Sequence, residues 1–179
     1  MSFFKIPTRN DVTPDNQGIF DNLTKMLGFV PNLYATFAHS ATALGTYLNL
    51  QNAKSSLTSK QREVINLVVS QVNTCEYCLS AHTAVGKMVG FTDEQILEIR
   101  TGRATFDPKL DALAQFARDV TEHRGHVATA ATEAFLAAGW TEGNVVDVVM
   151  VIGDKIISNY LHGVTKIEID FPVAPKLAA

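Results

Sequence analysis

Residues 58–92 read TSKQREVINLVVSQVNTCEYCLSAHTAVGKMVGFT, and this stretch predicts two consecutive helices with two cysteines near the junction. Thr58 and Gln61 form a capping-box pattern, which predicts the start of a helix over residues 58–73. A second helix is expected over residues 75–89, where apolar side chains recur at intervals of three and four. The stretch therefore predicts a helical hairpin that carries a dithiol beside its turn.

Helix signals recur along the rest of the chain, whereas strand signals are scarce. Thr92 with Gln95, and Asp107 before Pro108, are N-cap patterns that precede periodic apolar residues. Polar and apolar residues alternate over residues 166–171, so this segment could be extended and lie against a neighbour. We expect helices over residues 14–27, 31–54 with a break near Gly45, 58–73, 75–89, 92–101, 107–122, 127–138 and 141–162. The predicted fold class is all-α.

Length, composition and charge limit the class of protein. The chain has 179 residues, of which 46% are hydrophobic and 18% charged, so we expect one domain over residues 1–179 with an ample core. A net charge of -3 offers no basic surface for nucleic acid. Residues 1–7 lack the features of a signal peptide, and no apolar run reaches the ~18 residues of a membrane span. We therefore expect a cytoplasmic protein that binds neither nucleic acid nor a membrane.

The two cysteines and a histidine fall on one face of the predicted second helix. At about 100° per residue, Cys75, Cys78 and His82 lie at roughly 0°, 300° and 340°. Cys75 is at or beside the helix N-terminus, where free N–H groups favour a thiolate, so we expect it to be readily deprotonated. Cys78 lies one turn before His82, close enough for the imidazole to take its proton. These residues alone leave open which cysteine attacks a substrate.

Glu63, on the first helix of the hairpin, is placed to reach this histidine. If the helix over residues 58–73 turns back onto the next one, positions equally far from the turn come level, and Glu63 lies near residues 82–84. A carboxylate held against an imidazole fixes its tautomer and raises its basicity. We therefore predict that Glu63 orients His82.

The spacing of these four residues resembles a known motif. Glu63, eleven residues, Cys75-Glu76-Tyr77-Cys78, three residues and His82 match the Glu-x11-Cys-x-x-Cys-x-x-x-His pattern of alkylhydroperoxidase D and its relatives in the carboxymuconolactone decarboxylase family. The resemblance is centred on residues 57–100, and Ser158-Asn159-Tyr160 resembles the last helix of the family.

The resemblance implies a fold and an activity. The fold would be a single compact helical domain that assembles as a homo-oligomer. The activity would be that of a thiol-dependent peroxidase, in which Cys78 reduces hydrogen peroxide or an organic hydroperoxide and becomes a sulfenic acid. Cys75 would resolve the sulfenic acid to a disulfide, Glu63 and His82 would relay protons, and an unidentified thiol or dithiol reductant would restore the thiols. No metal, haem or flavin is needed for this cycle.

The chain departs from alkylhydroperoxidase D at Tyr77, which stands where that enzyme has a further active-site histidine. The resemblance therefore does not extend to that peripheral member of the proton relay. Family members that decarboxylate carboxymuconolactone lack the dithiol, so its presence argues against that activity here.

Other interpretations of the two cysteines stay open on the sequence. A static disulfide over so short a loop would stabilise the fold by only about 2 kcal/mol, and inert core cysteines are a further possibility. Zinc bound by Cys75, Cys78 and His82 would need a fourth ligand, and the sequence has no second Cys or His pair. The same dithiol would also serve a general disulfide oxidoreductase or a non-enzymatic redox-sensing module.

Overall fold

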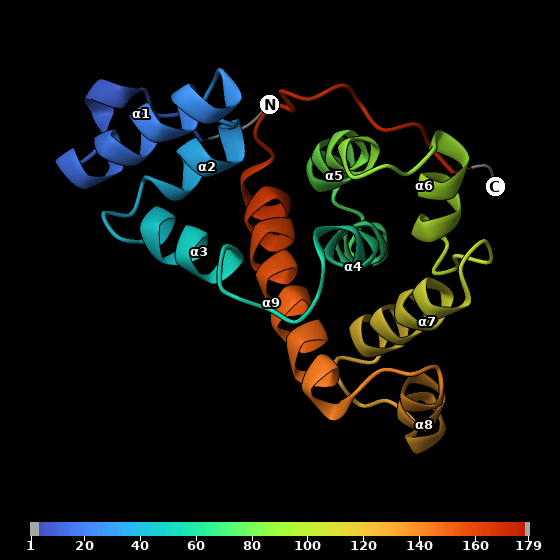
Figure 1. Cartoon of the computed structure of the whole chain (residues 1–179). Helices are drawn as coiled ribbons and strands as arrows, with labels where there is room; N and C mark the ends of the chain where they lie inside the picture. Colours follow the sequence, from blue (N-terminus) through green and yellow to red (C-terminus); the bar gives the residue numbers. More distant parts are fainter. Residues whose placement is uncertain (1–3, 178–179) are drawn as a thin grey trace.

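In a computed structural model of the protein, residues 4–177 are described and form nine α-helices and one 3-10 helix, with no strand among them (Figure 1). The predicted all-α fold class is confirmed. In chain order the elements are η1 (Arg9–Asp11), α1 (Pro14–Leu27), α2 (Asn32–Phe37), α3 (Ala43–Gln51), α4 (Ser59–Val72), α5 (Glu76–Met88), α6 (Asp93–Arg100), α7 (Pro108–Glu122), α8 (Thr129–Ala137) and α9 (Glu142–Thr165).

Helix α4 lies at the centre of the fold and packs against α5, α6, α7 and α9. Every residue from 63 to 70 is buried, because neighbouring helices cover α4 on several sides. The main hydrophobic core surrounds this helix, with Ile65, Leu67 and Val69 packed against Leu113 and Val148 among others. Since α4 is fixed on so many sides, it offers a rigid support for the helix that follows it.

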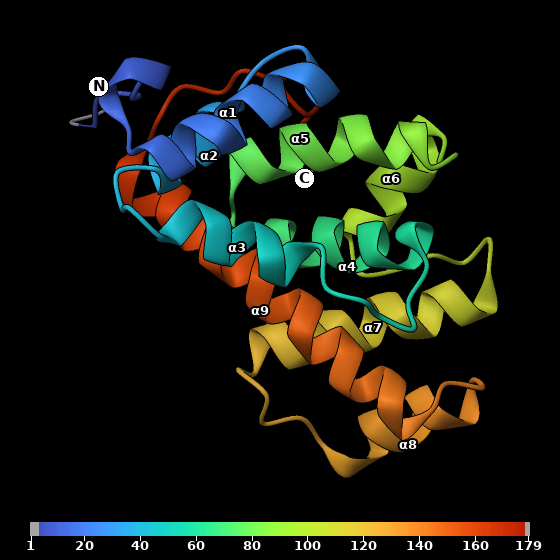
Figure 2. The same ribbon diagram turned by 60° about the vertical axis from the view of Figure 1, so that its left-hand side comes forward.

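A second hydrophobic cluster joins α1, α2 and α3 to α5 and the end of the chain. It includes Phe20, Phe37 and Tyr47 from the first helices. It also includes Cys75, the N-cap of α5, and Cys78 within α5. In Figure 2, α1 and α2 lie on the opposite side of the molecule from α7 and α8. The dithiol is thus buried where the N-terminal helices meet the α4–α5 hairpin, at the edge of the main core.

The predicted helix over residues 31–54 is divided, but Gly45 is not the place of the break. The chain leaves the helical path over residues 38–42, and Gly45 lies inside α3. The buried amide of Asn16 donates hydrogen bonds to the carbonyl groups of Ala38 and Ser40, at 3.4 and 3.0 Å. A side chain from α1 therefore satisfies carbonyls that the break would otherwise leave without a partner.

The segment after α9 is extended, as predicted, and packs on its own chain. Asp170 accepts hydrogen bonds from the backbone N–H of Asn32 and from the hydroxyl of Tyr77, both at 2.7 Å. Further on, Ala174 donates to the hydroxyl of Ser80 at 3.0 Å. The tail therefore runs across α5 on its way towards α6 (Figure 1).

Over residues 4–177, no single helix is both long and apolar enough to cross a membrane, although α8 and α9 taken together, bent by 114°, reach that length and composition. The single domain was expected over residues 1–179, and residues 1–3 and 178–179 of that range lie outside the described residues. The expectation that residues 1–7 are not a signal peptide also rests in part on residues 1–3.

Candidate active site

The turn between α4 and α5 places the first cysteine at the start of a helix. Thr74 has φ +53°, a left-handed conformation that reverses the chain, and the N–H of Cys75 then donates to the carbonyl of Ser70 at 2.9 Å. Cys75 is the N-cap of α5, and its Sγ accepts the backbone N–H of Cys78 at 3.3 Å. The hairpin predicted over residues 58–89 is therefore confirmed, with the dithiol in its second helix's first turn.

The two sulfur atoms are close together and almost fully buried. Both cysteines are free thiols, and their Sγ atoms lie 2.7 Å apart. Cys75 is 3% exposed and Cys78 is 2% exposed. The hydrogen bond from Cys75 lowers the pKa of Cys78 to about 6, against the effect of burial and with help from the charges of Lys155 and His82. Cys78 is therefore largely a thiolate at neutral pH.

The expectation that Cys75 is readily deprotonated is wrong. Its pKa is raised, because its thiol donates a hydrogen bond to Cys78, because it is buried, and because a Cys78 thiolate repels a second negative charge. The backbone hydrogen bond at the helix start acts in the expected direction but is outweighed. When one of two thiols in contact has lost its proton, the remaining proton is shared by the pair. Here it stays on Cys75.

Glu63 and His82 form the pair that the spacing predicts. The Nδ1 atom of His82 lies 2.7 Å from Oε2 of Glu63, and the amide of Asn66 donates to Oε1 of the same carboxylate at 2.8 Å. Burial alone would raise the pKa of Glu63, but the charge and hydrogen bond of His82, with Lys155 and Asn66, hold it below the ordinary value. Glu63 is therefore a carboxylate that holds the imidazole through one nitrogen.

A cavity of about 210 Å³ opens beside this group. Its wall combines residues of α2, α3, α5 and α9 with the C-terminal tail, and most of it is apolar or aromatic. Its polar and aromatic lining includes Tyr34, Tyr47, Tyr77, Cys78, His82 and Lys155. The structure thus brings Cys78 and His82 to one cavity, with Cys75 and Glu63 directly behind them.

Tyr77 has a larger role in this wall than the packing role expected from the sequence. Its hydroxyl accepts the N–H of Leu33 at 3.1 Å and donates to Asp170 at 2.7 Å, so it ties α5 to α2 and to the tail. Burial, reinforced by the contact with Asp170, raises the pKa of Tyr77. It stays a neutral phenol and holds one side of the cavity in place.

Lys155 was not identified from the sequence as a site residue. It lies on α9 within a run of apolar residues, where a lysine next to an aspartate is unusual, and it is 2% exposed. That signal was present in the sequence, but only the tertiary structure shows that α9 brings this lysine to the cavity beside Cys78.

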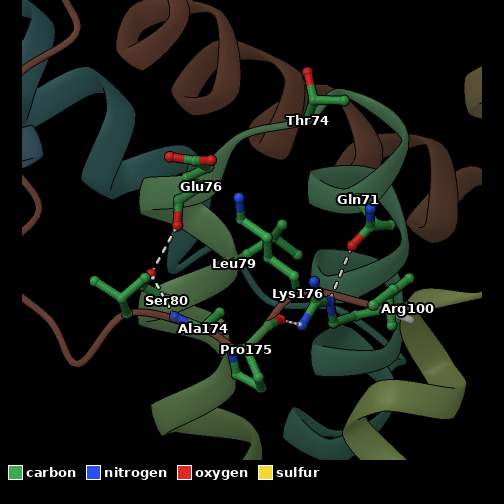
Figure 3. Close-up of a pocket in the computed structure, with 11 residues that line it drawn as sticks. Gln71, Thr74, Glu76, Leu79, Ser80, Arg100, Ala174, Pro175 and Lys176 are labelled. Atoms are coloured by element: carbon green, nitrogen blue, oxygen red, sulfur yellow. Dashed lines mark hydrogen bonds between the residues drawn. The ribbon is translucent and has the colours of Figure 1, made fainter. Parts of the chain in front are cut away.

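A second cavity, of about 270 Å³, lies on another face of α5 and holds none of the four motif residues (Figure 3). Arg100 donates to the carbonyl of Pro175 at 2.7 Å and to Gln71 at 2.9 Å, so the tail forms part of its wall. The guanidinium group of Arg100 is therefore engaged in holding the tail. Among residues 4–177, no group of three His, Cys, Asp or Glu side chains is arranged to hold a metal ion. The dithiol cavity is therefore the candidate active site.

Comparisons with known proteins concern the fold first. A crystal structure of a peroxidase-related protein from Ralstonia eutropha, described as an alkylhydroperoxidase AhpD core, superposes with a TM-score of 0.85 at 22% identity, over 94% of this chain and 92% of that one. A peroxidase-related protein from Silicibacter sp. gives 0.80 at 22% identity, over 93% and 91%. The debrominase Bmp8 with bound 2,3,4-tribromopyrrole gives 0.77 at 14% identity, over 95% and 94%.

The sequence itself matches a family. No curated protein sequence matches the chain. Residues 35–119 match the carboxymuconolactone decarboxylase family, and this segment contains Glu63, Cys75, Cys78 and His82. The motif, the matched segment and the helical architecture agree: residues 35–119 are similar to the carboxymuconolactone decarboxylase family, and the chain has an alkylhydroperoxidase D-like fold.

Proposed function

We propose that this protein is a thiol-dependent peroxidase that reduces hydrogen peroxide or an organic hydroperoxide. The observation that supports this most is a pair of touching thiols with opposite pKa shifts at the edge of a cavity. A thiolate is the form of cysteine that attacks peroxide, and Cys78 has a pKa of about 6. Cys75 keeps its proton and is in position to attack next.

The proposed cycle begins with attack of the Cys78 thiolate on one oxygen of the peroxide. The O–O bond breaks, Cys78 becomes a sulfenic acid, and the other oxygen leaves with the electron pair and takes up a proton as water or an alcohol. Cys75 then attacks the sulfenic sulfur, a disulfide forms, and water is released. An external thiol or dithiol reduces the disulfide and completes the cycle. The 2.7 Å separation of the sulfurs supports the second step.

Glu63 and His82 are proposed to move protons at Cys78. Because the Glu63 carboxylate holds Nδ1, the imidazole is fixed with its Nε2 edge free to exchange a proton, and Nε2 makes no hydrogen bond with any residue of the described part of the chain. A base held by a buried carboxylate is fixed in tautomer and orientation, as in other nucleophilic sites. The pair would therefore take the proton from Cys78 when the thiol re-forms.

The size of the cavity supports organic hydroperoxides as well as hydrogen peroxide. A volume of about 210 Å³ equals that of about seven water molecules in the liquid, far more than hydrogen peroxide fills. Three tyrosines and aliphatic side chains line it, which suits an apolar group.

The test is to trap the sulfenic acid in single-cysteine variants. Reduced protein is titrated with hydrogen peroxide and with cumene hydroperoxide, and the products are identified by mass spectrometry with a sulfenic-acid reagent. We expect Cys75→Ser to accumulate the sulfenic acid at Cys78 and Cys78→Ser to form none. A sulfenic acid at Cys75 in Cys78→Ser, with none at Cys78 in the other variant, would reverse the assignment.

A general disulfide oxidoreductase would use the same two thiols. The burial of Cys75 and Cys78, which are 3% and 2% exposed, disfavours it, because the attacking Sγ must reach a bulky disulfide in line with the S–S bond that breaks. Stopped-flow oxidation rates of the reduced protein with a peroxide and with a small disulfide compare the two activities. We expect the peroxide to react much faster.

A non-enzymatic redox sensor is the remaining alternative. Its dithiol would react with peroxide but would not turn over with supplied reductants. Turnover with a thioredoxin-type or lipoyl-type dithiol therefore distinguishes it from a peroxidase.

The proposal includes partners and a location. The cycle requires a thiol or dithiol reductant, so we place the protein in a reducing compartment, the cytoplasm. We also propose that copies of the chain assemble, because α9 presents a row of exposed apolar side chains that includes Val146, Val149 and Tyr160.

A further inference from the structure

Lys155 is a buried ammonium group whose hydrogen-bonding capacity is unused within residues 4–177. It is 2% exposed, and its Nζ atom, which carries three N–H donors, makes no hydrogen bond with the described residues. The nearest carboxylate oxygen belongs to Asp154, 3.9 Å away, at the limit of an ion pair. Burying an ammonium group without a hydrogen-bond partner is costly, and the charges that offset the cost here include those of Asp154, Glu63 and the Cys78 thiolate.

The charge of the Lys155 ammonium group affects residues that line the dithiol cavity. Lys155 forms part of the wall of the cavity that contains Cys78 and His82. Its charge lowers the pKa of Cys78 and opposes the rise that burial causes at Tyr34. Asp154 instead contributes to a different cavity, between α3 and α9. The aspartate therefore does not stand between the ammonium and a molecule bound next to Cys78.

Peroxide reduction creates a negative charge on the departing oxygen, and each of the four motif residues already has another role in the proposed cycle. His82 is held by Glu63 and serves Cys78, which is on the same helix. Cys75 keeps its proton for the resolving step. The oxygen that leaves as the O–O bond breaks still needs a cation and a proton, since an alkoxide or hydroxide is a poor leaving group.

We propose that Lys155 binds the departing oxygen of the peroxide and gives it a proton. This inference rests on the proposed peroxidase function. The Cys78 sulfur forms a bond to the terminal oxygen, which keeps its hydrogen, and the O–O bonding electrons go to the departing oxygen. That oxygen takes a proton from the Lys155 ammonium and leaves as an alcohol or water, and the neutral amine recovers a proton from solvent. Helix α5 thus supplies the nucleophile and α9 supplies the acid.

The experiment compares two substrates that differ in their need for an acid. Ethyl hydroperoxide loses an alkoxide, which requires a proton, whereas peracetic acid loses a carboxylate, which does not. Second-order rates of oxidation of the reduced protein are measured at pH 7 for wild type and Lys155→Met, with methionine chosen because it fills a similar volume without charge. Any change in the thiolate population of Cys78 slows both substrates equally and cancels in the ratio of the two rates.

We expect Lys155→Met to lower the ratio of the ethyl hydroperoxide rate to the peracetic acid rate by about 100-fold, the range of general acid catalysis. An unchanged ratio overturns the role of Lys155 even if both rates fall. Lys87→Met, which removes an exposed lysine of α5 paired with Asp93, is the matched control and should leave both rates as in wild type.

A second variant covers the case in which Lys155→Met does not fold well. If Lys155→Met folds poorly because Asp154 loses its partner, the variant Asp154→Asn/Lys155→Met removes both buried charges, and the same fall in the ratio is expected. A wild-type protein that reacts with neither peroxide refutes the peroxidase function itself, whereas a reactive wild type with an unchanged ratio in the variants refutes only the role of Lys155.

Discussion

At the scale of single residues, one hydrogen bond decides how the two thiols divide their work. The Cys75 thiol donates to Cys78, so the pKa of Cys78 falls to about 6 while that of Cys75 rises. The Cys75 donor is the largest contribution that lowers the pKa of Cys78, ahead of Lys155 and His82. The residue that would resolve the sulfenic acid is therefore also the residue that prepares the nucleophile.

Replacing Cys75 by alanine should raise the pKa of Cys78 from about 6 towards the ordinary thiol value of about 8.5. In wild type, pH 7 lies above the pKa of Cys78, so Cys78 is mostly thiolate. In Cys75→Ala, pH 7 would lie below the pKa of Cys78, so Cys78 would be mostly thiol. The rate of alkylation of Cys78 by iodoacetamide, followed against pH by mass spectrometry, reports the midpoint. Cys75→Ser keeps a hydroxyl donor and is the control, so its midpoint should stay lower than that of the alanine variant. Equal midpoints in the two variants would show that the hydrogen bond is not the cause.

Replacing Glu63 by glutamine should slow oxidation of Cys78 by peroxide about tenfold or more, because the imidazole loses its charged partner at 2.7 Å. The pKa of Glu63 lies below its ordinary value, so the carboxylate is charged at pH 5 and above, and the defect should persist over that whole range. Rates against pH provide the measurement, and Glu76→Gln, which changes an exposed carboxylate on the same hairpin, is the control. An unchanged pH-rate profile in Glu63→Gln would contradict the proposed relay.

At the scale of elements, the site is assembled by four packed segments. Helix α4 supplies Glu63 and α5 supplies the dithiol and His82, while α9 adds Lys155 and the tail closes one side. Tyr77 connects these parts, because its hydroxyl bonds both the start of α2 and Asp170 of the tail. The cavity therefore depends on contacts between segments far apart in the sequence.

Replacing Tyr77 by phenylalanine should lower the free energy of unfolding by about 1–3 kcal/mol, since the N–H of Leu33 and the carboxylate of Asp170 would each lose a buried partner. Equilibrium unfolding in urea measures the change. Tyr160→Phe makes the same substitution at a side chain that is 61% exposed in the single chain, and at a protein concentration where the chain is monomeric it should change the value by less than about 0.5 kcal/mol. Equal effects of the two substitutions would show that the Tyr77 hydroxyl does not hold the tail.

At the scale of the whole molecule, α9 has two different faces. One face is buried against α4 and the cavity, and the other exposes apolar side chains at helical spacing: Val146, Val149, Met150, Ile157, Tyr160 and Val164. At about 100° per residue these positions fall within one stripe along the helix. An exposed apolar stripe of this length is typical of an interface between proteins.

Replacing Val149 by lysine in this stripe should shift the protein towards the monomer. The charge would be buried between copies without a partner, which weakens association. Sedimentation equilibrium at several concentrations measures the assembly state. Met26→Lys, at a methionine of α1 that is 70% exposed, is the control and should leave the assembly unchanged. A wild-type protein that is monomeric at all concentrations would refute the proposed assembly.

Features that depend on neighbouring residues could be predicted from the amino-acid sequence. The caps at Thr58 and Thr92 locate helix starts because their hydrogen bonds are local, and the i, i+4 spacing of Cys78 and His82 follows from the helical repeat. The fold class and the pairing of Glu63 with His82 were predictable for the same reason, since a short turn brings consecutive helices side by side.

Features that depend on packing between distant segments could not be predicted in this way and became visible in the folded chain. The amide of Asn16 on α1 bonds carbonyls at the break over residues 38–42, and α9 places Lys155 in the wall of the cavity that Cys78 also lines. The helix N-terminus favoured a Cys75 thiolate, yet burial and the contact with Cys78 reversed that preference. Desolvation and long-range contacts arise only when the chain is folded, and at this site they outweigh the local signals on which a sequence-based prediction rests.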